Sequence, residues 1–128
     1  MSRSERVPPT EAELAILRVL WSDGPSTVRA VHEALGGDAR IRYTTTLKQL
    51  QVMTEKGSVR RDESQRSHIY STVLKEAETE KSLVKGFVDR VLQGSVHKMV
   101  VHALESDKVT DQEIAQIKRL LKQRENRK

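Results

Sequence analysis

The 128-residue chain contains no cysteine. This absence excludes disulfide bonds, thiolate zinc sites, copper–thiolate clusters and a cysteine nucleophile together. Aromatic residues are also scarce, at 3% of the chain, and comprise Trp21, Tyr43, Tyr70 and Phe87. So few large apolar side chains give a small chain little material for a self-sufficient core. We therefore expect part of the core to be shared between two copies of the chain.

The sequence also lacks long hydrophobic runs. No apolar stretch approaches the roughly 18 residues that a membrane-spanning helix needs, and the first residues carry no apolar stretch of the secretory-signal type. We therefore expect a soluble, cytoplasmic protein without membrane insertion. Lys plus Arg number 23 against 18 Asp plus Glu, which gives a formal net charge of +5. A basic chain of this size favours a polyanionic partner.

Hydrophobic periodicity predicts three helices in the first half of the chain. Thr10 and Glu13 have the spacing of a capping box, which begins the first helix. Ser26 is expected to cap the second helix, over about 27–35. The third helix, over about 43–56, is the one whose surface chemistry stands out.

The third helix is expected to end at Gly57, a residue suited to the left-handed C-cap. Its apolar positions form one face, and a second face has no role in the core, namely Thr45, Lys48, Gln49 and Val52. Threonines 44–46 are poor helix formers. Short hydroxyls near a helix N-terminus suit contacts to phosphates or base edges, and simple capping with solvation explains them equally well.

Two short strands, 58–62 and 68–71, are expected around a polar turn, anchored by Val59 and Ile69, with Tyr70 as a further candidate anchor. Two strands alone are barely stable, so the hairpin must pack against the helices. Three helices followed by a hairpin form the winged helix-turn-helix arrangement, whose third helix can enter the major groove of DNA.

Charge is distributed unevenly over this half of the chain. Residues 40–66 carry seven basic and three acidic side chains, whereas residues 11–35 carry two basic and four acidic ones. The excess positive charge therefore falls on the predicted reading helix and hairpin, where phosphates would be met. A basic face that is merely solvated is the alternative explanation.

The second half of the chain is predicted to be helical, with three helices. Thr110 and Glu113 repeat the capping-box pattern at the start of the last one. The predicted fold is therefore mostly α with a small β-hairpin. It comprises an N-terminal winged-helix DNA-binding domain, 1–73, and a helical dimerisation domain, 74–128.

The apolar stripes of the last three helices would struggle to form a core alone. Two-fold pairing of copies would bury these stripes and set two reading helices about 34 Å apart on one face of a duplex. A monomeric six-helix domain is the alternative. The residues expected at the dimer interface are Val84, Phe87, Val88, Val91, Val96, Met99, Val100, Leu104, Ile114, Ile117, Leu120 and Leu121.

Catalytic and metal-binding patterns are missing from the sequence. His97 and His102 are five residues apart, so they do not share a helix face as a metal-binding pair four apart would. His32 is expected on a helix surface. No glycine-rich phosphate loop and no Ser/His/Asp arrangement is present. We therefore expect neither an enzyme nor a metal or other cofactor.

Four sequence blocks resemble the penicillinase repressor (BlaI/MecI/CopY) family of winged-helix transcriptional regulators. They are PTEAEL from Pro9, YTTTLK from Tyr43, MTEKG from Met53 and RRDES from Arg60. The order and separation of the second and third blocks make the signature specific, and the resemblance covers nearly the whole chain. It implies a homodimeric repressor on a palindromic operator. The third helix would read the major groove, the hairpin would touch the DNA backbone, and the helical tail would form the dimer.

The resemblance implies Thr44, Thr45 and Lys48 as reading positions. Val52 stands where relatives often carry a basic residue, so we expect it to meet a thymine methyl group. The complete set of residues expected to bind DNA is Tyr43, Thr44, Thr45, Lys48, Gln49, Val52, Arg60, Arg61, Arg66 and His68.

The resemblance also bears on how repression is relieved. The copper-responsive branch senses through cysteines, which this chain lacks. In the antibiotic-responsive branch a membrane-bound sensor protease cuts the helical tail near an Asn-Phe pair, and the matching place here is His102–Ala103, without that pair.

Two other functions are compatible with the residues. In the first, the winged helix is an interaction adaptor that binds an acidic protein partner instead of DNA. In the second, it is an RNA-binding module, although no aromatic pair lies on a predicted strand to stack unpaired bases.

Overall fold

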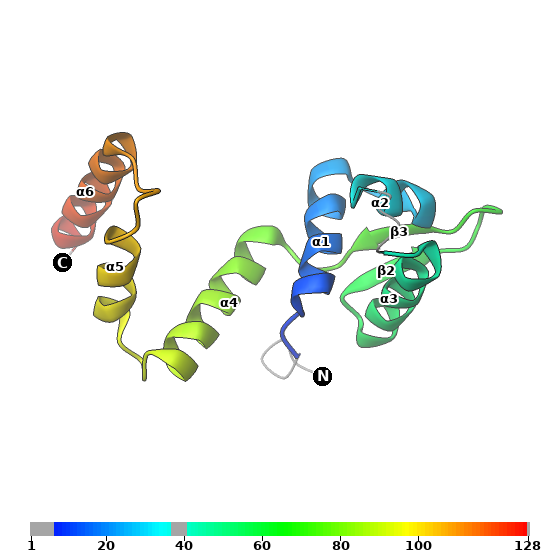
Figure 1. The fold of residues 1–128 in the computed structure, drawn as a ribbon, viewed down its shortest axis with the longest axis horizontal. Coiled ribbons are helices and arrows are strands. Elements are labelled where there is room, and N and C mark those ends of the chain that lie inside the picture. Colours follow the sequence, from blue (N-terminus) through cyan, green and yellow to red (C-terminus); the bar gives the residue numbers. More distant parts are fainter. Residues whose placement is uncertain (1–6, 37–40, 128) are drawn as a thin grey trace. The chain divides into compact units, whose positions relative to one another are not determined.

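The computed structural model describes residues 7–36 and 41–127. The chain divides into two compact units, one up to Leu83 and the other from Val84, and each is described by itself. Mostly helical structure with a small antiparallel sheet confirms the predicted fold class. The elements are α1 (Glu11–Asp23), β1 (Ser26–Thr27), α2 (Val28–Ala34), α3 (Tyr43–Lys56), β2 (Val59–Asp62), β3 (Ile69–Thr72), α4 (Glu76–Val91), α5 (Val96–Leu104) and α6 (Asp111–Asn126) (Figure 1).

Helix α1 begins with the predicted capping box. The backbone N–H of Glu13 donates to the Thr10 hydroxyl at 3.2 Å, and the Thr10 N–H donates to the Glu13 carboxylate at 2.9 Å. The helix ends where Gly24 adopts φ 80°, a conformation that a side chain with a Cβ would disfavour. Local chemistry therefore fixes both ends of α1.

The start of α2 differs from the prediction by one residue. The cap is Thr27, whose hydroxyl accepts from the Ala30 N–H at 3.1 Å, whereas the Ser26 hydroxyl donates to the Gly24 carbonyl at 2.8 Å. Ser26 and Thr27 also form β1, a third strand that the sequence did not predict. Two residues are too short to show an alternating pattern, so only pairing with β3 reveals this strand.

The sheet has the strand order β1-β3-β2, and both pairings are antiparallel. Figure 1 labels the two strands of the hairpin, β2 and β3. Its main anchor to the helices is Tyr70 on the central strand, which is 1% exposed. Val59 on β2 is buried as predicted, whereas Ile69 is only half-buried. The hairpin thus packs on the helices through both of its strands, with Tyr70 on β3 and Val59 on β2 in the core.

The core of the winged-helix unit combines all three helices with the sheet. Its buried apolar residues are Ile16, Leu17, Leu20, Val28, Val31, Leu50, Met53, Val59 and Tyr70. At the edge of this core, the indole N–H of Trp21 donates to the Leu74 carbonyl at 2.9 Å. This bond ties the end of the sheet region to α1.

In the second unit side chains cap the starts of α5 and α6. Thr110 and Glu113 form the predicted capping box of α6, and Ser95, which the sequence did not single out, caps α5. Neither α5 nor α6 has a buried residue in the isolated chain. None of the helices in residues 7–36 and 41–127 has the length and apolar character needed to cross a membrane.

Leu50 offers a test of the core. It is fully buried on α3, so Leu50→Ala is expected to lower the free energy of unfolding by about 2–5 kcal/mol through lost burial and a residual cavity. Urea unfolding followed by the fluorescence of Trp21, the single tryptophan, measures this unit. Gln51→Ala, at an exposed position on the same helix, is the control and should change stability by less than about 0.5 kcal/mol. Equal effects of the two variants would contradict this packing.

Candidate functional site

Helix α3 presents one buried face and one open face. Thr46, Leu50 and Met53 are fully buried on the inner side. The outer side faces a groove between α3 and the start of α1. The groove is lined by Thr10, Glu13, Thr44, Thr45, Lys48, Gln49, Val52 and Lys56.

Five of the ten residues expected to bind DNA meet in this groove, which we call the α3 groove. They are Thr44, Thr45, Lys48, Gln49 and Val52. Thr44, Thr45 and Lys48 are exposed, and Gln49 and Val52 are half-buried. One cation, two hydroxyls, one amide and one apolar side chain are therefore available on a single helix face, a mixture suited to reading base edges.

An ion pair at the border of the α3 groove was missed by sequence reasoning. Lys56 Nζ lies 2.9 Å from Glu13 Oε2, and the Glu13 side chain is 4% exposed. Burial alone would raise the pKa of Glu13. The Thr10 N–H and the Lys56 ammonium stabilise the charged form more strongly, so the pKa lies below its ordinary value. The pair ties the first turn of α1 to the last turn of α3, and no local pattern joins residues 43 apart in sequence.

A second groove lies between α2, the start of α3 and strand β3. We call it the Tyr43 groove. It is lined by Thr27, Val28, Arg29, Tyr43, Leu47, Arg66, Ser67, His68 and Tyr70. Three more of the expected residues, Tyr43, Arg66 and His68, therefore come together here rather than in the α3 groove.

The two remaining expected residues, Arg60 and Arg61, lie on β2 and line neither groove. Arg60 is exposed, whereas Arg61 Nε lies 2.8 Å from Glu63 Oε1. The pKa of Arg61 is raised, first by a hydrogen bond with the Tyr70 side chain and then by the charge of Glu63. The guanidinium of Arg61 is thus already engaged within the hairpin.

Thr46 and His32 depart from the expectations for them. Thr46 is fully buried, and its Oγ1 lies 3.0 Å from Nδ1 of His32. His32 is half-buried, so the expectation of a surface histidine was wrong. Thr46 is therefore a structural contact between α2 and α3, and only Thr44 and Thr45 of the threonine run face outward. Helical spacing carried a signal for this, because Thr46 is four residues before Leu50 and seven before Met53, which places it on the buried face.

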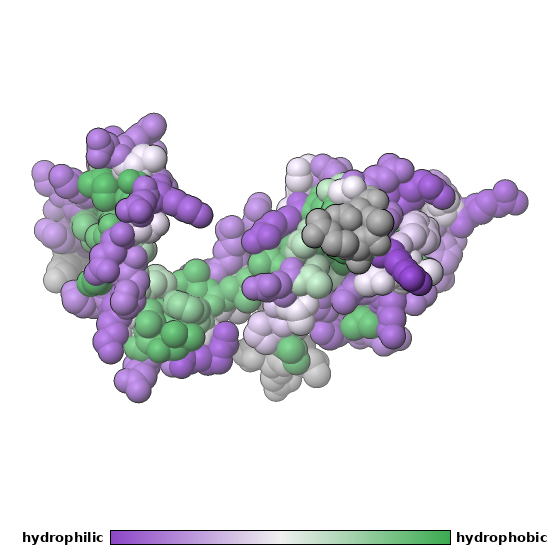
Figure 2. Space-filling model, in the orientation of Figure 1, coloured by the Kyte–Doolittle hydropathy of each residue, from purple (hydrophilic) through white to green (hydrophobic). Residues whose placement is uncertain are grey.

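The residues expected at a dimer interface lie on α4, α5 and α6. Val88 is 5% exposed, and three others, Met99, Ile114 and Ile117, are half-buried. The remaining eight are exposed: Val84, Phe87, Val91, Val96, Val100, Leu104, Leu120 and Leu121. Green surface over α4 in Figure 2 marks part of this apolar exposure.

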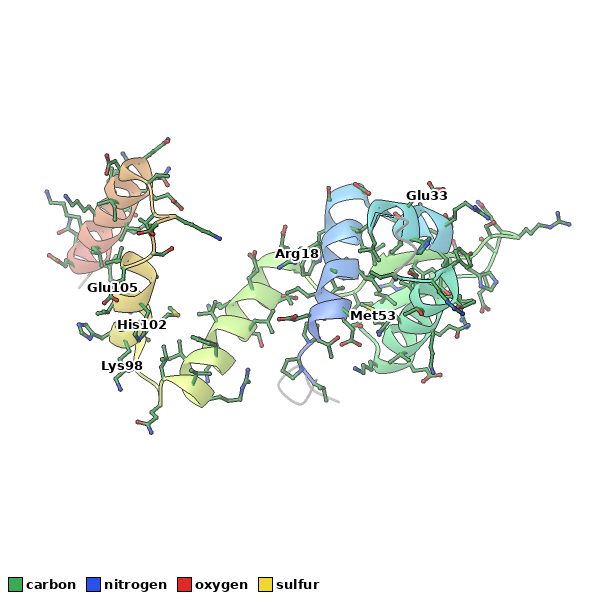
Figure 3. The ribbon with its side chains drawn as sticks, in the orientation of Figure 1. Arg18, Glu33, Met53, Lys98, His102 and Glu105 are labelled. Carbon is green, nitrogen blue, oxygen red and sulfur yellow. The ribbon has the colours of Figure 1, made fainter. Side chains whose placement is uncertain are left out.

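His102 and Ala103, the expected cleavage position, are exposed in the last turn of α5 (Figure 3). A protease that takes an extended substrate would need this turn to unwind. Across the described residues, no three His, Asp or Glu side chains are grouped so that they could hold a metal ion.

Three helices, an antiparallel β2–β3 hairpin (residues 59–72, the wing) and an outward-facing third helix define the winged-helix class. The chain belongs to the penicillinase repressor family, whose pattern matches residues 9–123. It is 24% identical over 119 residues to the penicillinase repressor of Bacillus licheniformis, covering 93% of each chain. It is also 35% identical over 100 residues to the transcriptional regulator BlaI of Mycobacterium tuberculosis, covering 74% of this chain and 70% of that protein.

A solved structure supports the fold. The structure of a MarR family protein from Bacillus stearothermophilus is similar with a TM-score of 0.54 at 18% identity, covering 94% of this chain and 76% of the other. The family resemblance predicted from the four sequence blocks is confirmed, and the two relatives are named as a repressor and a transcriptional regulator.

The Glu13–Lys56 pair predicts a pH-dependent stability. Glu13→Gln should lower the free energy of unfolding by about 1–3 kcal/mol near neutral pH, because it removes a charged acceptor from two hydrogen bonds. The pKa of Glu13 is lower in the folded state, so this stabilisation is complete above the unfolded-state pKa and is lost as the pH falls through the folded value.

The free energy of unfolding of the native chain and of Glu13→Gln is measured by urea unfolding at a series of pH values. The difference between the native chain and Glu13→Gln should shrink below about pH 4.3. Glu11→Gln, at an exposed site in the same turn of α1, serves as the control with little effect at any pH. If the difference in free energy of unfolding stays constant down to pH 3, the charge of Glu13 is not the source of the stabilisation.

Proposed function

We propose that this chain is a DNA-binding transcriptional repressor that acts as a homodimer on a palindromic operator, in the cytoplasm. The observation that carries the proposal is the convergence of Thr44, Thr45, Lys48, Gln49 and Val52 on the open side of α3. The buried side of the same helix fixes its orientation, so these five side chains face outward from a rigid support. Membership of the penicillinase repressor family supports the same conclusion.

The chemistry of the five expected DNA-binding residues in the α3 groove supports a role for each of them. Lys48 donates to a guanine edge or a phosphate, and Thr44 and Thr45 donate to phosphates near the start of the helix. Gln49 can pair with the edge of an adenine, and Val52 offers an apolar contact to a thymine methyl group. A helix with this mixture discriminates between sequences rather than binding all duplexes alike.

The wing supplies charge without sequence preference. Arg60 and Arg66 are exposed and can meet phosphates of the DNA backbone, as can His68 when protonated. Arg61 is bonded to Glu63, so its contribution to phosphate binding is smaller than its formal charge suggests. The backbone contacts set the register in which α3 meets the bases.

A second copy of the chain is the occupant proposed for the exposed apolar surface of α4, α5 and α6. Nine large apolar side chains are exposed there, the eight expected ones and Val101 on α5, and full burial of each would contribute about 1.5–3 kcal/mol. A two-fold pair also presents two α3 helices to successive major grooves, which matches a palindromic site. The protein-interaction adaptor remains the alternative, and electrophoretic mobility shift on the DNA upstream of the chain's own gene separates it from the repressor.

Relief of repression by a membrane-bound sensor protease at His102–Ala103 stays a prediction. Any such cut requires the last turn of α5 to open first, because both residues are helical. Local opening of a terminal helical turn requires much less free energy than unfolding of the core.

Lys48 and Arg66 separate sequence reading from backbone binding. Lys48→Ala should weaken operator binding by about 1–3 kcal/mol while changing binding to random duplex much less. Arg66→Ala should weaken both duplexes equally and flatten the dependence of affinity on salt concentration. Fluorescence anisotropy with labelled operator and random DNA measures both effects.

The matched control is Arg18→Ala, which removes one charge from an exposed site on α1 that lines neither groove. It should leave both affinities nearly unchanged. Equal losses on operator and random DNA for Lys48→Ala would remove Lys48 from the reading face. Failure of the native chain to bind any duplex at low salt would overturn the proposed function.

Phe87 tests the dimer. The native chain should scatter light as a particle of twice the 14.6 kDa chain mass, whereas Phe87→Asp should give a single chain, because a charge would be buried without a partner. Gln112→Asp adds the same charge on the polar side of α6 and should remain a dimer. Circular dichroism checks that helix content is retained. A native chain that stays single at micromolar concentration would contradict the pairing.

A further inference from the structure

The ring of Tyr43, the first residue of α3, is contacted by two side chains of α2. The guanidinium carbon of Arg29 lies 5.9 Å from the ring centroid. The ring of His32 meets the Tyr43 ring edge-on, with centroids 5.8 Å apart and an angle of 79° between planes. Arg29 and His32 are three residues apart on a helix, so they lie on the same face. Tyr43 is therefore held from the α2 side while 42% of it stays exposed.

These contacts matter because α3 has no side-chain cap of its own. Arg42 is the N-cap residue and makes no capping bond with its side chain. The backbone N–H groups of Thr45 and Thr46 donate to the Arg42 carbonyl, at 2.9 and 3.2 Å. The contacts of Tyr43 and Thr46 with α2 therefore help to position the first turn of α3.

The Tyr43 groove is cationic. Arg29, Arg66 and His68 are among its lining residues, and no Asp or Glu is. Among residues 7–36 and 41–127, no carboxylate forms an ion pair with Arg29, which is exposed. Its guanidinium carbon lies over the Tyr43 ring, and a guanidinium in such a contact can still donate its N–H groups to an anion.

We propose that Arg29 binds a backbone phosphate of the duplex in the Tyr43 groove. The Tyr43 ring orients the guanidinium, and Arg66 supplies a second positive charge. Tyr43 and Thr44 are consecutive residues, so a duplex that meets Thr44 in the α3 groove passes beside Tyr43. An arginine suits this position because its planar fork can stack on a ring and still donate to phosphate oxygens, which a lysine cannot do.

Sequence reasoning did not single out Arg29. It lies in a stretch, residues 11–35, whose acidic side chains outnumber its basic ones. Only the packing of α2 beside α3 brings it to the positively charged side of the molecule. The inference rests on the proposed DNA binding, and it adds a contact from α2 to those of α3 and the wing.

The test is the salt dependence of duplex binding, measured by fluorescence anisotropy with operator and random DNA. Arg29→Gln keeps an unbranched polar side chain, although a shorter one, and removes the charge. It should lower the slope of log affinity against log salt by about 0.9 for each protomer, or about 1.8 for a dimer, and weaken both duplexes alike. Arg18→Gln, on α1 (Figure 3), is the matched control and should keep the native slope. Urea unfolding should show that both variants stay folded under the binding conditions, since both sites are exposed.

A double-mutant cycle tests the role of the ring. Tyr43→Leu should weaken duplex binding in the native background by more than it does in the Arg29→Gln background, because the ring acts partly through Arg29. Equal losses in the two backgrounds would overturn the orienting role of Tyr43. A native slope for Arg29→Gln would overturn the phosphate contact while leaving the proposed function standing, whereas absence of duplex binding by the native chain would overturn the proposed function itself.

Discussion

Burial of the inner face of α3 is the constraint on which the rest of the winged-helix unit depends. Leu50 and Met53 are fully enclosed in the core formed with α1, α2 and the sheet. Because successive helical residues are 100° apart, enclosing this face forces Thr45, Lys48 and Val52 toward the outside. These outward-facing side chains are not required for the core, so they can differ in chemistry without loss of the fold and are available for recognition.

Two polar contacts hold the ends of α3 against the other helices. Thr46 bonds to His32 near its start, and Lys56 pairs with Glu13 at its end. Apolar packing is non-directional, whereas a hydrogen bond weakens steeply when its angle departs from the preferred geometry, so it restricts rotation and sliding of the helix more closely. Side chains that read base edges require that accuracy, so these contacts connect the stability of the unit to the proposed reading function.

The sequence allowed the local features to be predicted and left the contacts between elements undetermined. The bounds of α3 with Gly57, and the two capping boxes, follow from chemistry within four residues. Strand β1 and the two contacts at the ends of α3 depend on residues brought together by folding. The division of the expected DNA-binding residues between two grooves depends on side-chain direction at the start of α3, where Tyr43 and Thr44 diverge.

Counting charges along the sequence overstates the number of basic side chains of residues 40–66 that are available to bind phosphates. The basic excess of residues 40–66 includes Lys56 and Arg61, and both are ion-paired inside the unit. Arg29 lies in an acidic stretch and yet faces the Tyr43 groove. The charge available to a duplex is therefore spread over α2, α3 and the wing rather than concentrated on one element. Such a distribution favours contacts to both sides of a major groove, because phosphates flank the groove while the bases lie at its floor.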